Sequence, residues 1–197
     1  MLCKRPSSGG PVRLLFMGSP GQNWQGVDVL SGLAKDLGEG FHIHVVGPRR
    51  EELGAAELPG NIHVHGYLTR EEYLPLLRET HIGLGTVALH RKGMQEACPI
   101  KVREYIAAGL PVILPYTDTA FSGRCPDWVL EVPNEEGVFE NSAVLDIVRA
   151  FCEKHRDTVV GHEESAPYIG AAVLEAKKLE VIQRWIRPFG RQSFERK

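Results

Sequence analysis

The sequence has few cysteines, no large excess of charge of either sign and no long hydrophobic run, and each shortage excludes a class of protein. Its four cysteines in 197 residues form no C-x-x-C spacing, which argues against a zinc knuckle or a disulfide framework and favours a reducing cytoplasm. A formal net charge of -2 leaves no strongly basic surface, so nucleic acid is not an expected partner. No apolar run approaches the roughly 20 residues of a membrane span, and the start is too polar for a secretory signal. The sequence therefore predicts a soluble, cytoplasmic protein.

Short apolar runs alternate with segments of helical period along most of the chain. This alternation is typical of β-α-β units on a parallel sheet. It predicts six strands, at 13–18, 41–47, 61–66, 81–88, 111–116 and 128–133. It predicts helices between them, at 26–38, 69–79, 99–108 and 141–156, with a weaker one near 50–57. The expected fold is α/β, a single Rossmann-like domain whose parallel sheet of about six strands carries helices on both faces.

Three parts of unequal size are expected along the chain. Residues 1–11 are expected to be a flexible amino-terminal segment, and 12–170 the Rossmann-like domain. Residues 171–197 combine an amphipathic helical pattern with a basic tail that also holds Trp185 and Phe189. Such a segment fits a helix at a membrane surface, so a peripheral membrane contact is one interpretation.

Two long loops rich in glycine and polar residues, SPGQNWQG at 19–26 and LHRKGMQEACP at 89–99, each follow a predicted strand. Open α/β sheets bind ligands beyond the carboxyl ends of their strands. Pro99 and Gly109 fit the first position and the stop of the helix that follows the second loop. A ligand site is therefore predicted where these loops meet that helix.

Lys101 and Glu104 lie three residues apart near the amino end of this helix, on a different face from an apolar stripe of Val102, Tyr105 and Ile106. The free amides and positive potential of a helix start suit a phosphate. A carboxylate can accept two hydrogen bonds from a ribose diol, so the three features together favour a nucleoside diphosphate sugar. The alternative is a solvated ion pair worth a few tenths of a kcal/mol.

The stretch "CPIKVREYIAAGLPVI" resembles the S-P-L-K-x-x-E-Y-x-A-x-G-x-P-V-I signature of retaining GT-B glycosyltransferases, in the carboxyl-terminal, donor-binding half of family-4 (glycosyl transferases group 1) enzymes. Glu96 and Glu104 match that family's pair of glutamates separated by seven residues. "FMGSPGQNWQGVDVLSGLAKDL" is similar to its glycine-rich turn followed by K-G-V-D-x-L-L-x-A, and "NIHVHGYLTREEYLPLLRETHIGL" to the run that borders its base pocket. The three matches cover roughly residues 13–134 in the family's order, which makes the resemblance specific.

The resemblance implies a role for each matching residue. Glu104 would hold the ribose hydroxyls, Glu96 would approach the transferred sugar or its phosphate, and Lys101 would act with the helix amides on the diphosphate. Glu96 and Lys101 are thus the expected catalytic residues. The expected binding residues are Glu104, Gly18, Ser19, Gly21, Arg91, Lys92, Pro99, Ile100 and Tyr67. No cofactor and no metal are expected, since basic groups would stabilise the leaving diphosphate and the sequence has no D-x-D.

The chain departs from the family pattern in charge and in length. Ser19 and Gln25 stand near two places where the family usually has Arg and Lys for the diphosphate. Arg91 and Lys92 are candidates to replace that charge, although a loop pair of this kind is often simply solvated. A complete GT-B enzyme has two Rossmann-like halves, and only one is present. The resemblance therefore implies an acceptor-binding amino-terminal domain or a partner chain, onto which the final helix would cross.

The predicted function is binding of a UDP- or GDP-sugar for hexose transfer to an acceptor, with base, sugar and acceptor left open. One alternative is a noncatalytic nucleotide-sugar-binding module, and another is a domain like those of sugar-nucleotide epimerases.

Three further patterns are ambiguous. "GLGTVA" at 83–88 matches a dinucleotide fingerprint, but a polar loop follows it instead of a helix. Histidines alternate on two predicted strands, which fits either a zinc site or a half-covered sheet face. Asp118 and Thr119 fit either a ligand contact or a plain turn.

Overall fold

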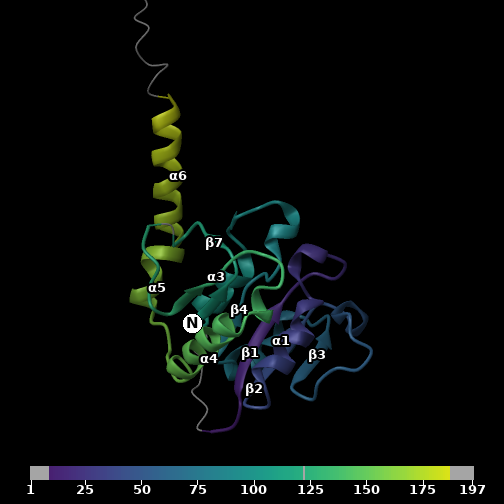
Figure 1. Ribbon diagram of the computed structural model, residues 1–197. Helices are drawn as coiled ribbons and strands as arrows, with labels where there is room; N and C mark the ends of the chain where they lie inside the picture. Colours follow the sequence, from purple (N-terminus) through teal and green to yellow (C-terminus); the bar gives the residue numbers. More distant parts are fainter. Residues whose placement is uncertain (1–8, 122, 187–197) are drawn as a thin grey trace, which may run out of the picture.

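The protein, described here by a computed structural model for residues 9–121 and 123–186, is built around one six-stranded parallel sheet (Figure 1). The strands are β1 (Val12–Met17), β2 (Phe41–Val46), β3 (Ile62–Gly66), β4 (Ile82–Leu84), β6 (Val112–Leu114) and β8 (Val129–Glu131). Their order across the sheet is β3-β2-β1-β4-β6-β8, with every pairing parallel. This is the strand order of a Rossmann fold. Strands β2 and β3 are added on one side of β1, and from β4 onward the strands of this sheet are added on its other side. The predicted fold class is confirmed.

Helices cover both faces of the sheet. The helices are α1 (Val29–Leu37), α2 (Arg70–Glu79), α3 (Ile100–Ala107), α4 (Ser142–Lys154), α5 (His162–Ile169) and α6 (Ala171–Ile186), with short 3-10 turns η1 (Asn23–Gln25), η2 (Arg50–Leu53), η3 (Leu89–Lys92) and η4 (Val138–Glu140). Residues of α1 and α4 share one hydrophobic cluster with Leu14 and Phe16 of β1. Residues of α2, α3 and α5 share the other with Leu15 and Met17. Because β1 is covered on both sides, Leu14 to Met17 form a continuous apolar run.

The structure differs from the predicted elements where they are short. The strand predicted over 81–88 ends at Leu84, and the segment near 50–57 forms only the turn η2. A second sheet pairs β5 (Glu96–Ala97) with β7 (Thr117–Asp118), and neither it nor α5 was predicted. A two-residue strand has too few positions for a period to be detected, and it forms here because its partner lies close in space.

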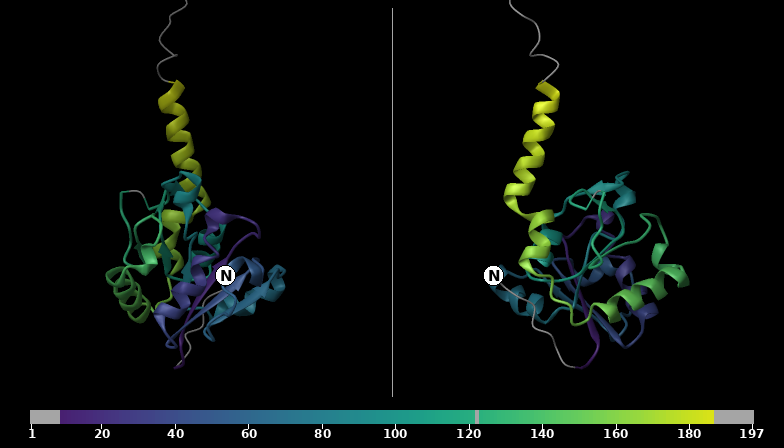
Figure 2. Two further views of the ribbon diagram at one scale, coloured as in Figure 1. Left: turned by 45° about the vertical axis from the view of Figure 1, so that its right-hand side comes forward. Right: turned by 90° about the vertical axis from the view of Figure 1, so that its left-hand side faces the viewer.

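Helix α6 extends beyond the body of the domain instead of packing along it (Figures 1 and 2). Its exposed apolar side chains are Leu179, Val181, Ile182, Trp185 and Ile186. Among the described residues, no helix is both long and apolar enough to cross a membrane. Most of the predicted flexible start, residues 1–8, and the basic tail from 187 onward lie outside the described residues.

Tyr105 anchors α3 to the central strand of the sheet. Its ring is fully buried, and its Oη accepts a hydrogen bond of 2.7 Å from the backbone N–H of Met17. The ring lies directly over Gly83 of β4, where a Cβ would come within 2.4 Å of it. The three residues therefore fix α3 relative to the carboxyl end of β1.

Replacing Tyr105 with phenylalanine is expected to lower the free energy of unfolding by about 1–3 kcal/mol, because the Met17 N–H is left buried without an acceptor. Urea and thermal unfolding measure the change, and roughly 2–4 °C of melting temperature is expected per kcal/mol. Tyr67→Phe is the matched control, since Tyr67 is 83% exposed. Equal melting of the two variants would contradict the anchoring role.

Candidate functional site

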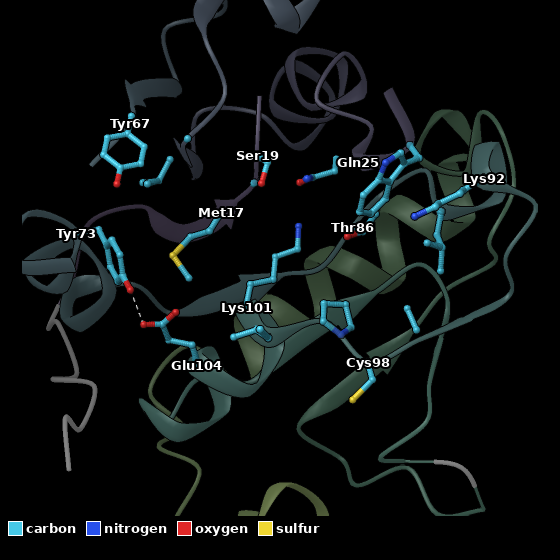
Figure 3. A pocket seen from close by; sticks show the side chains of 18 of the residues that line it. Met17, Ser19, Gln25, Tyr67, Tyr73, Thr86, Lys92, Cys98, Lys101 and Glu104 are labelled. Atoms are coloured by element: carbon cyan, nitrogen blue, oxygen red, sulfur yellow. Dashed lines mark hydrogen bonds between the residues drawn. The ribbon is translucent and has the colours of Figure 1, made fainter. Parts of the chain in front are cut away.

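A cavity of about 530 Å³ opens where the carboxyl ends of β1 to β4 meet the amino end of α3 (Figure 3). Its lining residues are Met17, Gly18, Ser19, Trp24, Gln25, Val46, Gly47, Tyr67, Leu68, Tyr73, Thr86, Leu89, Lys92, Met94, Ala97, Cys98, Pro99, Ile100, Lys101 and Glu104. The sheet reverses its winding between β1 and β4, so the chain after β1 leads to α1 on one face of the sheet and the chain after β4 leads to α3 on the other. This is the crevice in which open α/β sheets bind their ligands.

Two glycines let the ends of β1 and β2 approach each other at the floor of this cavity. The N–H of Gly18 donates to the carbonyl of Val46 at 2.9 Å. Gly47 has a φ of +100°, and a Cβ placed there would come within 1.8 Å of the Gly18 carbonyl oxygen. A side chain at Gly47 would therefore both strain the backbone and push the two loops apart.

Lys101 points from α3 into the space between Met17 and Thr86 (Figure 3). Its Nζ is buried and has no hydrogen-bond partner among the described residues. It lies 4.1 Å from the centre of the Phe16 ring, a cation–π distance. Burial lowers the pKa of Lys101 to about 7. A buried amine that nothing in the domain satisfies is a group that a ligand could satisfy.

The amino end of α3 faces the same cavity. Pro99 is the N-cap, with φ -70° and ψ 139°, one position earlier than the first helical position predicted for it. No side chain caps this end, and the first intrahelical contact is from the N–H of Val102 to the carbonyl of Pro99. The N–H groups of Ile100 and Lys101 are thus left for an external acceptor, and the helix dipole favours an anion there.

The Glu104 carboxylate lies one helical turn farther along α3 and is held by Tyr73 of α2. Tyr73 Oη donates to Glu104 Oε1 at 2.6 Å, as the dashed line in Figure 3 marks. Both side chains are partly buried and both line the cavity. The cavity therefore combines a buried amine, free helix amides and an oriented carboxylate.

Most of the predicted site residues lie together in this cavity. They are Gly18, Ser19, Tyr67, Lys92, Pro99, Ile100, Lys101 and Glu104. Lys92 Nζ lies 4.6 Å from the centre of the Trp24 ring, so the loops after β1 and β4 meet at the cavity mouth.

Three predicted site residues lie outside the cavity lining. The Arg91 guanidinium pairs with Asp28 at 2.8 Å and with both carboxylate oxygens of Glu136, and this hydrogen bonding lowers the pKa of Glu136 to about 2. Arg91 therefore joins loops of the domain and does not face the cavity. Gly21 N–H donates to Glu52 Oε2 at 2.6 Å on another part of the surface.

Glu96 is the third residue outside the lining. It is exposed in β5, where its backbone pairs with β7, while its neighbours Met94 and Ala97 do line the cavity. Its role toward a transferred sugar stays a prediction.

Ser19 and Gln25 line the cavity where cations were expected from the family pattern. Gln25 is only 5% exposed, and its Oε1 lies where a Cβ on Gly18 would come within 2.3 Å. This oxygen has no hydrogen-bond partner in the part of the chain that the structure describes. Lys101 and Lys92 are thus the cations that line the cavity.

Asp118 is a structural residue rather than a ligand contact. It is fully buried, and both its carboxylate oxygens accept hydrogen bonds of 2.6 Å from the guanidinium of Arg103. Arg103 also donates to Cys98 Sγ at 2.9 Å. This bidentate pair ties β7 to α3 just below the cavity.

The four alternating histidines form a ladder across β2 and β3. His42 Nδ1 and His63 Nε2 lie 3.1 Å apart, and His44 Nδ1 and His65 Nε2 lie 3.0 Å apart. The His44 ring stacks on the rings of His63 and His65, while the His42 ring is tilted toward that of His63. Burial, followed by the neighbouring His63, lowers the pKa of His44 to about 4. In the described residues, no group of three or more His, Cys, Asp or Glu is placed to hold a metal ion.

The glycines of "GLGTVA" have a packing role. A Cβ on Gly83 would meet the Tyr105 ring, and one on Gly85 would come within 2.9 Å of Leu114. Because neither glycine has a side chain, bulky residues can pack against β4 at these positions. No α-helix begins after the two glycines, since the chain continues into the 3-10 turn η3. The dinucleotide interpretation is therefore wrong.

Tyr73, Trp24, Thr86 and Met17 line the cavity although the sequence did not single them out. Tyr73 stands in a stretch that was matched to the base-pocket run, four residues after the N-cap Thr69. No periodicity shows that this tyrosine meets Glu104, because 31 residues separate them.

Comparison with known proteins agrees with this fold. A family model described as "Glycosyl transferases group 1" matches residues 11–157. No curated protein matches the sequence.

Among solved structures, TarM superposes with a TM-score of 0.60 at 14% identity over 91% of this chain and 36% of its own. Anabaena HepE, in a complex with UDP-glucose, superposes with a TM-score of 0.57 at 12% identity, over 86% of this chain and 49% of HepE. The carboxyl-terminal domain of the group 1 protein LpcC from Francisella tularensis superposes with a TM-score of 0.50 at 13% identity, over 80% of this chain and 85% of that domain. These identities show a shared fold, and the chain spans less than half of TarM and of HepE. With three quarters of its length matched, the chain belongs to the glycosyl transferases group 1 family and forms one Rossmann-like half of the GT-B architecture.

Proposed function

We propose that this domain binds a nucleoside diphosphate sugar in the cavity at the amino end of α3 and serves as the donor half of a retaining glycosyltransferase. The observation that carries the proposal is the buried, unpartnered Nζ of Lys101 in the same cavity as the free amides of α3 and the carboxylate of Glu104. A diphosphate satisfies the amine and the amides, and a ribose diol satisfies the carboxylate.

The same groups fit the charge that develops during transfer. As the bond between the sugar's anomeric carbon and the diphosphate oxygen breaks, its electron pair passes to the diphosphate. The acceptor oxygen bonds to that carbon and passes its proton to the departing diphosphate. Lys101 and the α3 amides are placed to stabilise the leaving diphosphate, a role that needs no metal ion when such donors are preorganised. Glu96, on the strand beside the cavity, is the proposed residue on the sugar side.

The proposal includes an acceptor-binding domain or a partner chain that packs on α6. The support is the row of exposed apolar residues on a helix that leaves the body of the domain, from Leu179 to Ile186. We place the protein in the cytoplasm, with contact of α6 with a membrane surface as the alternative. The described domain by itself is then expected to bind nucleotide weakly and to transfer little sugar.

A panel of nucleotides and nucleotide sugars tests the proposal by thermal melting. UDP or GDP, or one of their sugars, is expected to stabilise the domain by about 2.7 kcal/mol at 100 times its dissociation constant, while adenine nucleotides serve as the comparison. Glu104→Ala is expected to reduce the shift. If no nucleotide at millimolar concentration shifts the melt, and Glu104→Ala melts like the parent in every case, the site assignment fails.

A noncatalytic binding module is the second candidate. The observation that favours it is the neutral pair Ser19 and Gln25 lining the cavity where cations would assist a leaving diphosphate. Both candidates predict nucleotide binding, so binding does not separate them. Product analysis after adding an acceptor-binding half does, since only the enzyme turns over the sugar donor.

A further inference from the structure

The contact between Tyr73 and Glu104 joins two helices that the sequence places far apart. Tyr73 comes from α2 and Glu104 from α3, and the distance of 2.6 Å from Oη to Oε1 is that of a charge-assisted hydrogen bond. In the part of the chain that the structure describes, Tyr73 is the only side chain that hydrogen-bonds to this carboxylate. The second oxygen, Oε2, is thus left for a ligand in the cavity.

Tyr73 keeps its proton, so it always acts as the donor. Burial, followed by the hydrogen bond to Glu104, raises the pKa of Tyr73 to about 12. The hydroxyl is therefore protonated throughout the physiological range, and the carboxylate is the acceptor.

Both partners are held by their own helices. Helix α2 begins with a capping box in which Thr69 N–H donates to Glu72 Oε2 at 2.7 Å, and Tyr73 follows in the next turn. The Tyr73 ring packs against the same hydrophobic cluster as Tyr105 of α3. The hydroxyl therefore has a fixed position toward which the longer, more flexible glutamate side chain is drawn.

An unheld glutamate loses rotamer freedom when it binds a ligand, at a cost of up to about 2 kcal/mol. Tyr73 orders the carboxylate beforehand, so less freedom is lost on binding. We propose that Tyr73 is a positioning residue that aims Glu104 at the ribose diol, and that it thereby sets the preference of this site for ribonucleotides over 2′-deoxyribonucleotides. This inference rests on the proposed nucleotide site.

The test compares UDP with 2′-deoxy-UDP, or GDP with 2′-deoxy-GDP, by calorimetric titration of the whole chain. In Tyr73→Phe, affinity for the ribonucleotide is expected to fall about 3- to 10-fold, while affinity for the deoxynucleotide changes by less than about 2-fold. The ratio of the two affinities therefore falls. In a Glu104→Ala background the same Tyr73→Phe change is expected to have no effect, because there is no carboxylate to position.

Two results would overturn the inference while leaving the nucleotide site intact. One is an equal loss of affinity for both nucleotides, which would show that Tyr73 supports the cavity only through packing. The other is an unchanged affinity for both nucleotides in Tyr73→Phe, which would show that the hydroxyl does not order Glu104. If the parent chain binds neither nucleotide, the result contradicts the proposed function itself. Melting curves of each variant identify any that fails to fold.

Discussion

Lys101→Met is expected to weaken nucleotide-sugar binding and at the same time to stabilise the empty domain. The Nζ of Lys101 is buried without a hydrogen-bond partner, so its desolvation destabilises the empty domain. Methionine has a similar length and can pack its sulfur against the Phe16 ring that the amine now faces. The free energy of unfolding should rise by about 1–3 kcal/mol. Loss of the charged donor should weaken nucleotide-sugar binding about 10- to 150-fold.

The gain in the free energy of unfolding of Lys101→Met over the parent should depend on pH between about 7 and 10.5. Lys101 has a pKa of about 7 in the folded domain, below the ordinary value of 10.5, so between these values the unfolded chain binds more protons. The stability of the parent therefore rises with pH across this window. The advantage of the methionine variant is complete below about pH 7 and disappears as pH approaches 10.5.

Urea unfolding at pH 7 and pH 10, with calorimetric titration of the nucleotide sugar, measures both effects. Lys92→Met is the matched control, because Lys92 lines the same cavity but is exposed, so no stability gain is expected from it. A Lys101→Met variant that melts below the parent, or that binds the donor as the parent does, would show that the amine is structural.

Binding of the nucleotide sugar should weaken about 10-fold between pH 6 and pH 8. If only the charged form of Lys101 holds the diphosphate, the affinity follows the fraction of that form, which is about 0.9 at pH 6 and about 0.1 at pH 8 for a pKa of about 7. The bound diphosphate raises the pKa of Lys101, so a proton is taken up on binding above pH 7. A nucleotide sugar is the right probe, because its diphosphate lacks the terminal phosphate group that itself titrates near pH 6.

The Lys101→Arg variant supplies the control for this pH dependence. An arginine stays charged over the whole range, so its nucleotide-sugar affinity should be flat between pH 6 and pH 8. Titrations in two buffers of different ionisation enthalpy count the protons taken up. A parent chain whose affinity is flat over this range would contradict the protonation of Lys101 on binding.

The sequence predicted the architecture because the long elements carry their own periods. All six main strands, and the helices α1 to α4, appear within a few residues of their predicted positions. The stripe of Val102, Tyr105 and Ile106 is fully buried, as its spacing predicted. The sequence signature also predicted that Lys101 and Glu104 lie on one helix at the ligand site, and both residues line the cavity.

Contacts between distant segments could not be predicted in the same way. Arg91 was a candidate ligand contact, yet Asp28 and Glu136 engage it, and both lie more than 40 residues away in the chain. Asp118, on a strand too short to show a period, likewise pairs with Arg103 of α3. Side-chain charge alone does not tell whether a partner is a ligand or another part of the domain.

The amino-acid sequence by itself determined the fold class and the place of Lys101 and Glu104 on the helix α3, because hydrophobic period and helix boundaries are local properties of the chain. Only the tertiary structure decided that Lys101 is buried without a partner, that Tyr73 holds Glu104 and that Arg91 faces away from the cavity. These facts depend on which distant segments come into contact when the chain folds, because those contacts set the burial and the hydrogen bonding of each side chain.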